Sequence, residues 1–306
     1  MDKWETSYDN EMRSIRFHNV WTLVPRSEVP TGCRVLGCRT VFLRKRDENN
    51  TVSRHKTRIV ARRFSQIEGI DYKDTFTPVA QLESVRTVLG LAASMDWEIH
   101  QFDVKTAFLH RKLTEDIYME QPEGQKEKGK ETWVCKLQKS LYSLKQAGRC
   151  WYTHLYDEMC KAGFTRVSVD HSVFVKKNDQ GSAMVTVHVD DMAATANNTV
   201  TLERTITALQ QIIDLVDMGP IKWFLGMRVS RNRRLRTISL SQGAYIDTVL
   251  RRFGMTDAYG VSTPLDPNVI LSTTMSPSTE KQKAAMQKIP YLAGVGSLMY
   301  ASMATR

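Results

Sequence analysis

The chain has 306 residues, of which 42% are hydrophobic and 25% charged, and a formal net charge of +10. This length allows two domains, or one large domain with subdomains, and supplies enough apolar residues for buried cores. The sequence has no apolar run long enough to cross a bilayer and no apolar signal-peptide centre near its start, so we expect a globular protein inside the cell.

The N-terminal half alternates between helical and extended patterns. Trp4, Tyr8, Met12 and Ile15 recur at helical spacing, which predicts an amphipathic helix over residues 2–17 packed by this stripe. The segments that follow are predicted as short strands over 20–64, including a basic hairpin with strands at 41–43 and 58–61 around a polar turn at 47–50, a helix over 85–95, a strand over 97–104 and a charged loop over 122–132.

The C-terminal half continues this mixture. It predicts a helix lined by Trp151, Leu155 and Met159 and ended by Gly163, a strand pair around Asp190, a helix capped near Asn198 or Thr199, strands over 223–229 and 237–240, a short helix from Gln242 to Gly254, and a linker over 262–289. Because strands and helices alternate irregularly, with hairpins between them, the predicted fold class is α+β with a largely antiparallel sheet.

The five cysteines do not indicate a disulfide framework or a zinc site. Their number is odd and none has Cys-x-x-Cys spacing, so we expect reduced thiols.

The positive charge is concentrated in two places. Residues 34–63 hold ten Lys or Arg against Asp47 and Glu48, and residues 228–236 hold five Arg. Such clusters suit a polyanionic partner, because each neutralised phosphate releases condensed counterions. A solvated basic surface is the alternative, but clustering at two sites favours nucleic acid.

Carboxylates stand at the ends of two apolar strand patterns. Asp190 and Asp191 follow one strand, and Asp103 follows another 87 positions earlier in the sequence. Taken singly, the first pair could close a hairpin and Asp103 could cap a helix. Three carboxylates meeting at one sheet edge would repel one another unless hard divalent cations lay between them. Two such ions, about 4 Å apart, promote nucleotidyl transfer.

Two other motif classes are absent or imperfect. Residues 124–130 match the Gly-x-x-x-x-Gly-Lys phosphate loop, but Glu131 replaces the hydroxyl residue and Gln121-Pro122 precedes it where a strand is required. This segment is therefore interpreted as a solvated charged loop. The seven histidines show neither a Ser-His-Asp arrangement nor the paired spacing of metal ligands.

An ordered series of motifs resembles the reverse transcriptase of copia-type LTR retrotransposons over nearly the whole chain. In chain order these are residues 56–62, 69–72, 75–79, 101–109, 118–124, 139–142, 144–147, 189–191, 224–226 and 296–300. Any one of them is weak, but the ordered series is specific.

The resemblance implies a right-hand polymerase fold, with fingers and a palm whose mainly antiparallel sheet is backed by helices. The implied segments are an N-terminal helix over 1–19, fingers over 20–97 and 121–148, a palm strand with the first catalytic Asp over 98–120, a palm core with the Asp-Asp hairpin over 149–221, a primer-grip-like hairpin and helix over 222–261, and a linker with the start of the connection toward RNase H over 262–306.

The same resemblance implies roles for individual residues. Asp103, Asp190 and Asp191 would be the catalytic carboxylates that bind two Mg²⁺ or Mn²⁺ ions. The nucleotide would be bound by Lys56, Arg58, Arg62, Phe108 and Gln146, with Phe108 excluding a ribose 2′-hydroxyl unless it is simply a core residue. Primer and template would be contacted by His188, Trp223, Leu225, Gly226, Arg228, Arg231, Arg233 and Arg234.

The implied partners are an RNA or DNA template with its primer, and deoxynucleoside triphosphates, in a cytoplasmic particle or the nucleus and without a membrane. The chain stops at Arg306, where family members continue toward RNase H, and it contains no integrase. It therefore resembles a polymerase fragment of a Pol polyprotein.

Some positions depart from the family pattern. His188 stands at a usual Tyr, Arg63 and Arg111 at usual Gly positions, Thr40 at a usual Trp and Gly148 where Pro is frequent. An Arg in a positive-φ turn would be destabilising. Two interpretations follow: an RNA-directed DNA polymerase, or a catalytically impaired relic of a decaying genomic copy that only binds nucleic acid.

Overall fold

The computed structural model describes residues 3–46, 51–109, 111–263, 265–266 and 268–305. The chain divides into two compact units, Met1–Ile221 and Lys222–Arg306, each described here by itself. The polar turn expected at 47–50 lies outside the described residues.

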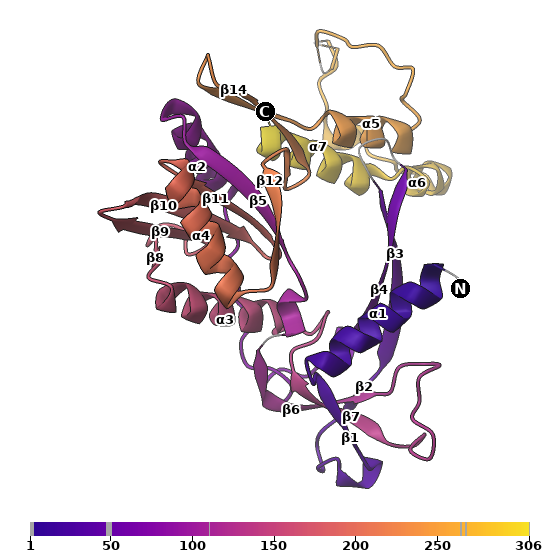
Figure 1. Cartoon of the computed structure of the whole chain (residues 1–306). Coiled ribbons are helices and arrows are strands. Elements are labelled where there is room, and N and C mark those ends of the chain that lie inside the picture. Colours follow the sequence, from indigo (N-terminus) through magenta and orange to yellow (C-terminus); the bar gives the residue numbers. More distant parts are fainter. Residues whose placement is uncertain (1–2, 47–50, 110, 264, 267, 306) are drawn as a thin grey trace. The chain divides into compact units, whose positions relative to one another are not determined.

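The first unit is built on a six-stranded sheet in the order β12-β5-β11-β10-β9-β8 (Figure 1). Each neighbouring pair is antiparallel. The strands are β5 (Glu98–Val104), β8 (Thr165–Arg166), β9 (Val173–Asn178), β10 (Gly181–His188), β11 (Asp191–Ala196) and β12 (Leu215–Pro220). The antiparallel α+β class expected from the sequence is therefore confirmed.

Two helices cover one face of this sheet. They are α3 (Ala147–Lys161) and α4 (Thr199–Ile212), and their buried side chains form one core cluster with Phe102, Val185 and Met192 of the strands. Asn198 caps α4 by accepting a hydrogen bond from the Thr201 amide at 2.8 Å, as the sequence suggested. Figure 1 shows α4 lying across the strands.

Helix α2 (Leu82–Ser94) contacts β10 and β11, and its buried residues lie outside the core cluster of α3 and α4. Because successive side chains of a strand point to opposite faces, we infer that α2 covers the other face. The central strands are thus enclosed by helices on both sides.

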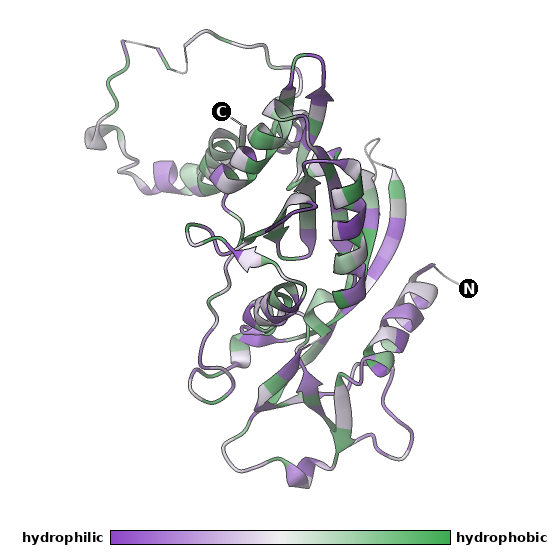
Figure 2. Ribbon diagram, turned by 60° about the vertical axis from the view of Figure 1, so that its left-hand side comes forward, coloured by the Kyte–Doolittle hydropathy of each residue, from purple (hydrophilic) through white to green (hydrophobic). Residues whose placement is uncertain are grey.

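The rest of the first unit forms a second core. A four-stranded sheet has the order β1-β7-β6-β2, and the hairpin β3-β4 packs against α1. These elements are α1 (Lys3–Phe17), β1 (Trp21–Val24), η1 (Arg26–Glu28), β2 (Val35–Leu36), β3 (Cys38–Arg46), β4 (Val52–Ala61), η2 (Arg63–Ser65), η3 (Ala107–Leu109), β6 (Lys112–Glu120) and β7 (Val134–Lys139). In Figure 2, α1 carries both hydrophilic and hydrophobic residues, as an amphipathic helix should.

Strand pairing divides the segment 98–120, which the sequence treated as one palm piece. β5 lies in the six-stranded sheet, whereas β6 pairs with β7 and β2 in the four-stranded sheet. The chain changes sheets at the turn around Thr106, a non-glycine residue with a φ of 50°. Strand β5 therefore ends at Val104, and residues 112–120 belong to the other sheet.

The second unit contains a three-stranded sheet and helices. Its elements are β13 (Trp223–Phe224), β14 (Met227–Asn232), β15 (Thr237–Ser241), α5 (Gly243–Arg252), η4 (Thr273–Met275), α6 (Glu280–Gln287) and α7 (Tyr291–Thr305). The single strand expected over 223–229 is wrong, because Leu225 and Gly226 have φ of 51° and 75° and reverse the chain between β13 and β14.

The linker expected over 262–289 is also partly wrong, because α6 lies inside it. Thr279 and Gln282 form a capping box at the start of α6, a local signal that outweighs the poor hydrophobic periodicity of this segment. Helix α7 was not predicted from the sequence.

Two further expectations concern side chains and membranes. All five cysteines are free, as expected. None of the helices within the described ranges combines the length and apolarity that crossing a membrane requires.

Candidate active site

The strand register brings the predicted acids to one end of the six-stranded sheet. Asp191, the first residue of β11, is the register partner of Asp103 near the end of β5. The backbone amide of Val104 donates to the carbonyl oxygen of Asp190 at 3.0 Å. Asp103 therefore lies beside acids that are 87 and 88 positions further along the chain.

A two-residue turn carries Asp190. His188 pairs with Asp191, so Val189 and Asp190 alone connect β10 to β11. The positive φ belongs to Val189, at 60°, and not to either aspartate. Asp190 therefore does lie in a hairpin turn, but the left-handed conformation belongs to a β-branched residue that tolerates it poorly.

The acids lie on the sheet face away from the core of α3 and α4. Phe102 and its register partner Met192 both belong to that core, so the pleat directs Asp103 and Asp191 to the opposite face. Asp103, Asp190 and Asp191 are all partly exposed. Within the described part of the chain, neither Asp103 nor Asp190 has a side-chain hydrogen bond or an ion pair.

The acids are not already gathered as a metal-ligand set. Among the described residues, no group of three or more His, Cys, Asp or Glu side chains is arranged to hold a metal ion. Binding of an ion would therefore have to draw the carboxylates together. Their chemistry suits that event, because carboxylate oxygens are the ligands that Mg²⁺ and Mn²⁺ prefer.

Tyr142 connects the acids to the predicted nucleotide residues, although the sequence did not indicate that it belongs to the site. Its ring is buried and contacts Phe108 edge to face, with centroids 5.6 Å apart, while the Arg58 guanidinium lies 5.1 Å from the ring centre. Burial raises the pKa of Tyr142; the charges of Glu11, Asp190 and Asp103 also raise it and that of Arg58 lowers it. Tyr142 is therefore within electrostatic range of two site acids and of Arg58.

Arg58 combines two properties of a ligand-binding side chain. Its Nε is buried and has no hydrogen-bond partner among the described residues. The other predicted basic residues are less closely connected to the acids. Lys56 acts electrostatically on Glu11, whose pKa burial raises, and Arg62 is exposed beside Gly37.

Gln146 is buried at the start of α3. Its Nε2 donates to the Asp71 carbonyl at 2.8 Å, and its Oε1 accepts from Gln66 at 3.1 Å. The Gln66 side chain also accepts from the Lys145 amide at 2.8 Å. These contacts favour a positioning role over direct contact with a nucleotide.

His188 and the arginine hairpin are the predicted primer and template residues. His188 ends β10, and its Nδ1 is buried without a partner among the described residues. In the second unit, Arg228 alternates with buried Met227 and Val229 along β14, so it points away from the interior. Arg233, Arg234 and Arg236 are exposed in the turn between β14 and β15.

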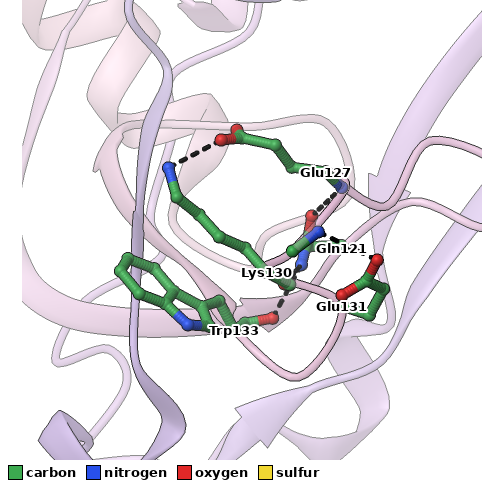
Figure 3. Close-up of polar contacts among 6 residues, drawn as sticks. Gln121, Glu127, Lys130, Glu131 and Trp133 are labelled. Atoms are coloured by element: carbon green, nitrogen blue, oxygen red, sulfur yellow. Dashed lines mark hydrogen bonds and ion pairs between the residues drawn. The ribbon is translucent and has the colours of Figure 1, made fainter.

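The phosphate-loop-like segment has a structural explanation (Figure 3). Gln121 is buried and donates to the carbonyls of Lys130 and Trp133 at 2.6 and 3.0 Å, while it accepts from the Glu127 amide at 3.0 Å. The Lys130 ammonium pairs with Glu127 at 2.6 Å and lies 5.1 Å from the centre of the Trp133 ring. The Gly129 amide donates to Glu131, which lowers the pKa of that carboxyl. These groups are satisfied internally, in agreement with a structural loop.

Two departures from the family pattern also have explanations. Arg63 begins the short helix η2 and has no positive φ, so the strain expected there is wrong. It lines an open cleft of about 670 Å³ together with Lys73 and Lys145. Arg111 pairs with Asp157 at 2.7 Å.

Paired strand-end acids beside an aromatic ring and an arginine whose Nε is buried and unpartnered among the described residues suit a metal-dependent enzyme that acts on phosphates. Comparison with known proteins agrees with this class. Residues 18–267 match the family model described as reverse transcriptase (RNA-dependent DNA polymerase). The chain therefore belongs to the reverse transcriptase family.

The similar curated proteins are copia-type Pol polyproteins of plants. The chain is 43% identical over 297 residues to the retrovirus-related Pol polyprotein from transposon TNT 1-94 of Nicotiana tabacum, covering 97% of this chain and 22% of that protein. It is 36% identical over 304 residues to the Pol polyprotein from transposon RE1 of Arabidopsis thaliana, covering 98% and 20%. The chain thus spans about a fifth of these relatives.

A foamy viral protease-reverse transcriptase, solved in complex with double-stranded DNA, is a structural neighbour. The TM-score is 0.44 and the sequence identity 12%, with 98% of this chain and 41% of that chain covered.

Proposed function

We propose that this chain is an RNA-directed DNA polymerase domain that transfers deoxynucleotides from their triphosphates to a primer 3′-hydroxyl. The observation that carries the proposal is the register of β5 and β11, which pairs Asp103 with Asp191 and ties Asp190 to Val104. Family membership supplies the chemistry that such acids perform in a polymerase.

In this proposal the six-stranded sheet with its helices is the palm, and the β3-β4 hairpin with the four-stranded sheet belongs to the fingers. Asp103, Asp190 and Asp191 would hold two Mg²⁺ or Mn²⁺ ions, which would supply polarisation of the attacking hydroxyl and stabilisation of the leaving pyrophosphate. Arg58 would bind the triphosphate through its Nε, which has no partner among the described residues. This nitrogen would donate a charge-assisted hydrogen bond to a phosphate oxygen.

Phe108 would exclude ribonucleotides by occupying the space that a 2′-hydroxyl needs. Its ring is partly buried between the two cores of the first unit and is supported by Tyr142. Tyr142 is therefore a support for both Phe108 and Arg58. Gln146 fixes the Asp71 segment to the start of α3.

Nucleic acid would be bound through backbone phosphates. The cleft lined by Arg63, Lys73 and Lys145 also contains Glu68 and Asp74, so its excess of positive charge is small. The exposed arginines of the β14-β15 turn separately offer positive charge suited to a primer-template. We also propose a cytoplasmic particle or the nucleus as the location, because the similar proteins are transposon polyproteins.

The test is primer extension on an RNA template with Mg²⁺ or Mn²⁺. The unmodified chain should synthesise DNA, and Asp103→Asn or Asp190→Asn should lower the rate at least about 1,000-fold, since each removes several kcal/mol of transition-state stabilisation. Equal synthesis by those variants would indicate a contaminant. Salt-sensitive binding of the primer-template without any extension would instead identify a relic that only binds nucleic acid.

A further inference from the structure

The turn that carries Asp190 is held in an unfavourable backbone conformation. Val189 has a φ of 60° in a two-residue connection between His188 and Asp191. A β-branched residue rarely adopts this region, so surrounding contacts must maintain it.

Both carbonyl groups of the turn are held from outside. The Asp190 carbonyl accepts from the Val104 amide of β5 at 3.0 Å, and the Val189 carbonyl accepts from the indole Nε1 of Trp151 at 2.7 Å. Trp151 lies on α3, is 2% exposed, and belongs to the same core cluster as Val187 and Met192, which flank the turn. The ring is therefore fixed in place, and its N–H is directed at the strained residue.

We infer that the Trp151 indole N–H is a positioning group for Asp190, and that it fixes the peptide between Val189 and Asp190. This inference rests on the proposed function of Asp190 as a metal-binding acid. Without the hydrogen bond, Val189 can relax toward an extended φ and rotate this peptide. That rotation moves the Asp190 carboxylate relative to Asp103, which is held independently in β5.

The same helix provides a matched control. Tyr152 also donates a hydrogen bond from a side chain to a backbone carbonyl, that of His171, at 2.7 Å. Trp151→Phe and Tyr152→Phe each remove one such donor, but only the first removes a contact with the turn.

The experiment measures primer extension for both variants at varied Mg²⁺ and nucleotide concentrations, together with thermal unfolding. Trp151→Phe should lower kcat about 10- to 100-fold and raise the half-saturating Mg²⁺ concentration about tenfold, with little change in KM, because a small misplacement of a reacting group has effects of this size. Tyr152→Phe should leave both quantities within about twofold even where it unfolds earlier.

A second substitution tests the role of strain. Glycine adopts a positive φ without penalty, so Val189→Gly should remove most of the effect of Trp151→Phe on kcat and on Mg²⁺ dependence. If Trp151→Phe fails to fold, benzothienylalanine at position 151 retains the ring shape without the N–H and provides the same comparison.

The inference is overturned if the Trp151 variant matches Tyr152→Phe in kcat and Mg²⁺ dependence while the unmodified chain is active. If the unmodified chain itself makes no DNA, the proposed function fails and amide hydrogen exchange decides the inference. Faster exchange over residues 187–192 in Trp151→Phe alone supports it, and equal exchange in both variants contradicts it.

Discussion

Two regions of the first unit resemble phosphate-binding sites in sequence. They differ in whether their polar groups have partners within the protein. In the loop over 121–133, the side chain of Gln121 forms hydrogen bonds with three backbone groups, and Lys130 and Glu127 form an ion pair. At the end of the six-stranded sheet, Asp103 and Asp190 have no hydrogen-bonded or charged side-chain partner within the described chain. Arg58 nearby leaves its Nε unpartnered.

The difference teaches where to look for function. A buried polar atom without a partner, such as the Nε of Arg58, is costly to the folded state, so its persistence favours a ligand that satisfies it. Groups that satisfy one another contribute to the fold and offer nothing to a substrate. Substitutions in the two regions should therefore have different consequences, on catalysis in one and on stability in the other.

After the substitutions of Asp103 and Asp190, the largest effect is expected at Arg58. Arg58→Ala should reduce kcat/KM for the deoxynucleoside triphosphate about 100-fold, because a hydrogen bond to a charged group contributes about 1.5–3 kcal/mol. Arg58→Lys should recover only part of this, since it retains the charge but not the planar fork. Lys130→Ala in the loop is the matched control and should leave kcat/KM unchanged in steady-state primer extension. A comparable loss of kcat/KM in Arg58→Ala and Lys130→Ala would contradict the proposed functional difference between the two regions.

The sequence predicted the elements at the site better than it predicted their contacts. Alternating apolar residues indicated the strands that end at Asp103 and Asp190, and ordered motifs indicated the family. The register that makes Asp191 the partner of Asp103 depends on long-range pairing, which a local pattern does not specify.

The contacts of two aromatic residues, Trp151 and Tyr142, could not be predicted from the sequence. Periodicity identifies a residue such as Trp151 as part of a core, but it says nothing about which carbonyl its N–H meets. Tyr142 was likewise found only as part of a motif, because its contacts with Phe108 and Arg58 join three separate segments. The mostly apolar segment 223–229 concealed the reversal at Leu225 and Gly226, since a non-glycine residue takes one of the positive φ values.

Gln121 should affect stability and not chemistry. Gln121→Ala removes three hydrogen bonds of a buried amide and should lower the free energy of unfolding by about 2 kcal/mol, measured by urea denaturation. kcat for primer extension should stay within about twofold at a temperature where the variant is folded. A selective fall in kcat without loss of stability would mean that the loop takes part in catalysis.

The carboxylate of Asp170 accepts hydrogen bonds from within the protein, whereas that of Asp103 accepts none from the described residues. It accepts from the amides of Gln81 and Ser172 at 3.0 and 2.9 Å. Burial acts to raise its pKa, but hydrogen bonds from Ser84 and these two amides outweigh burial and lower it. Asp170→Asn should reduce stability by about 1 kcal/mol near neutral pH.

The stabilisation by Asp170 should decrease as the pH falls. Because the folded-state pKa is lowered, the stabilisation by Asp170 is present above the unfolded value of about 3.9 and is lost as pH falls through the folded value. The difference between the unmodified chain and Asp170→Asn in urea denaturation should therefore shrink below about pH 4. A difference that grows on acidification would contradict this role.

The most direct test of the central claim is the binding of Mn²⁺, followed by electron paramagnetic resonance, to complexes with a chain-terminated primer-template and a deoxynucleoside triphosphate. The account predicts two bound ions for the unmodified chain and for Glu131→Gln, and an affinity at least about tenfold weaker in Asp103→Asn and Asp190→Asn, since each removes a charged oxygen ligand. Unchanged Mn²⁺ affinity in both aspartate variants would contradict it.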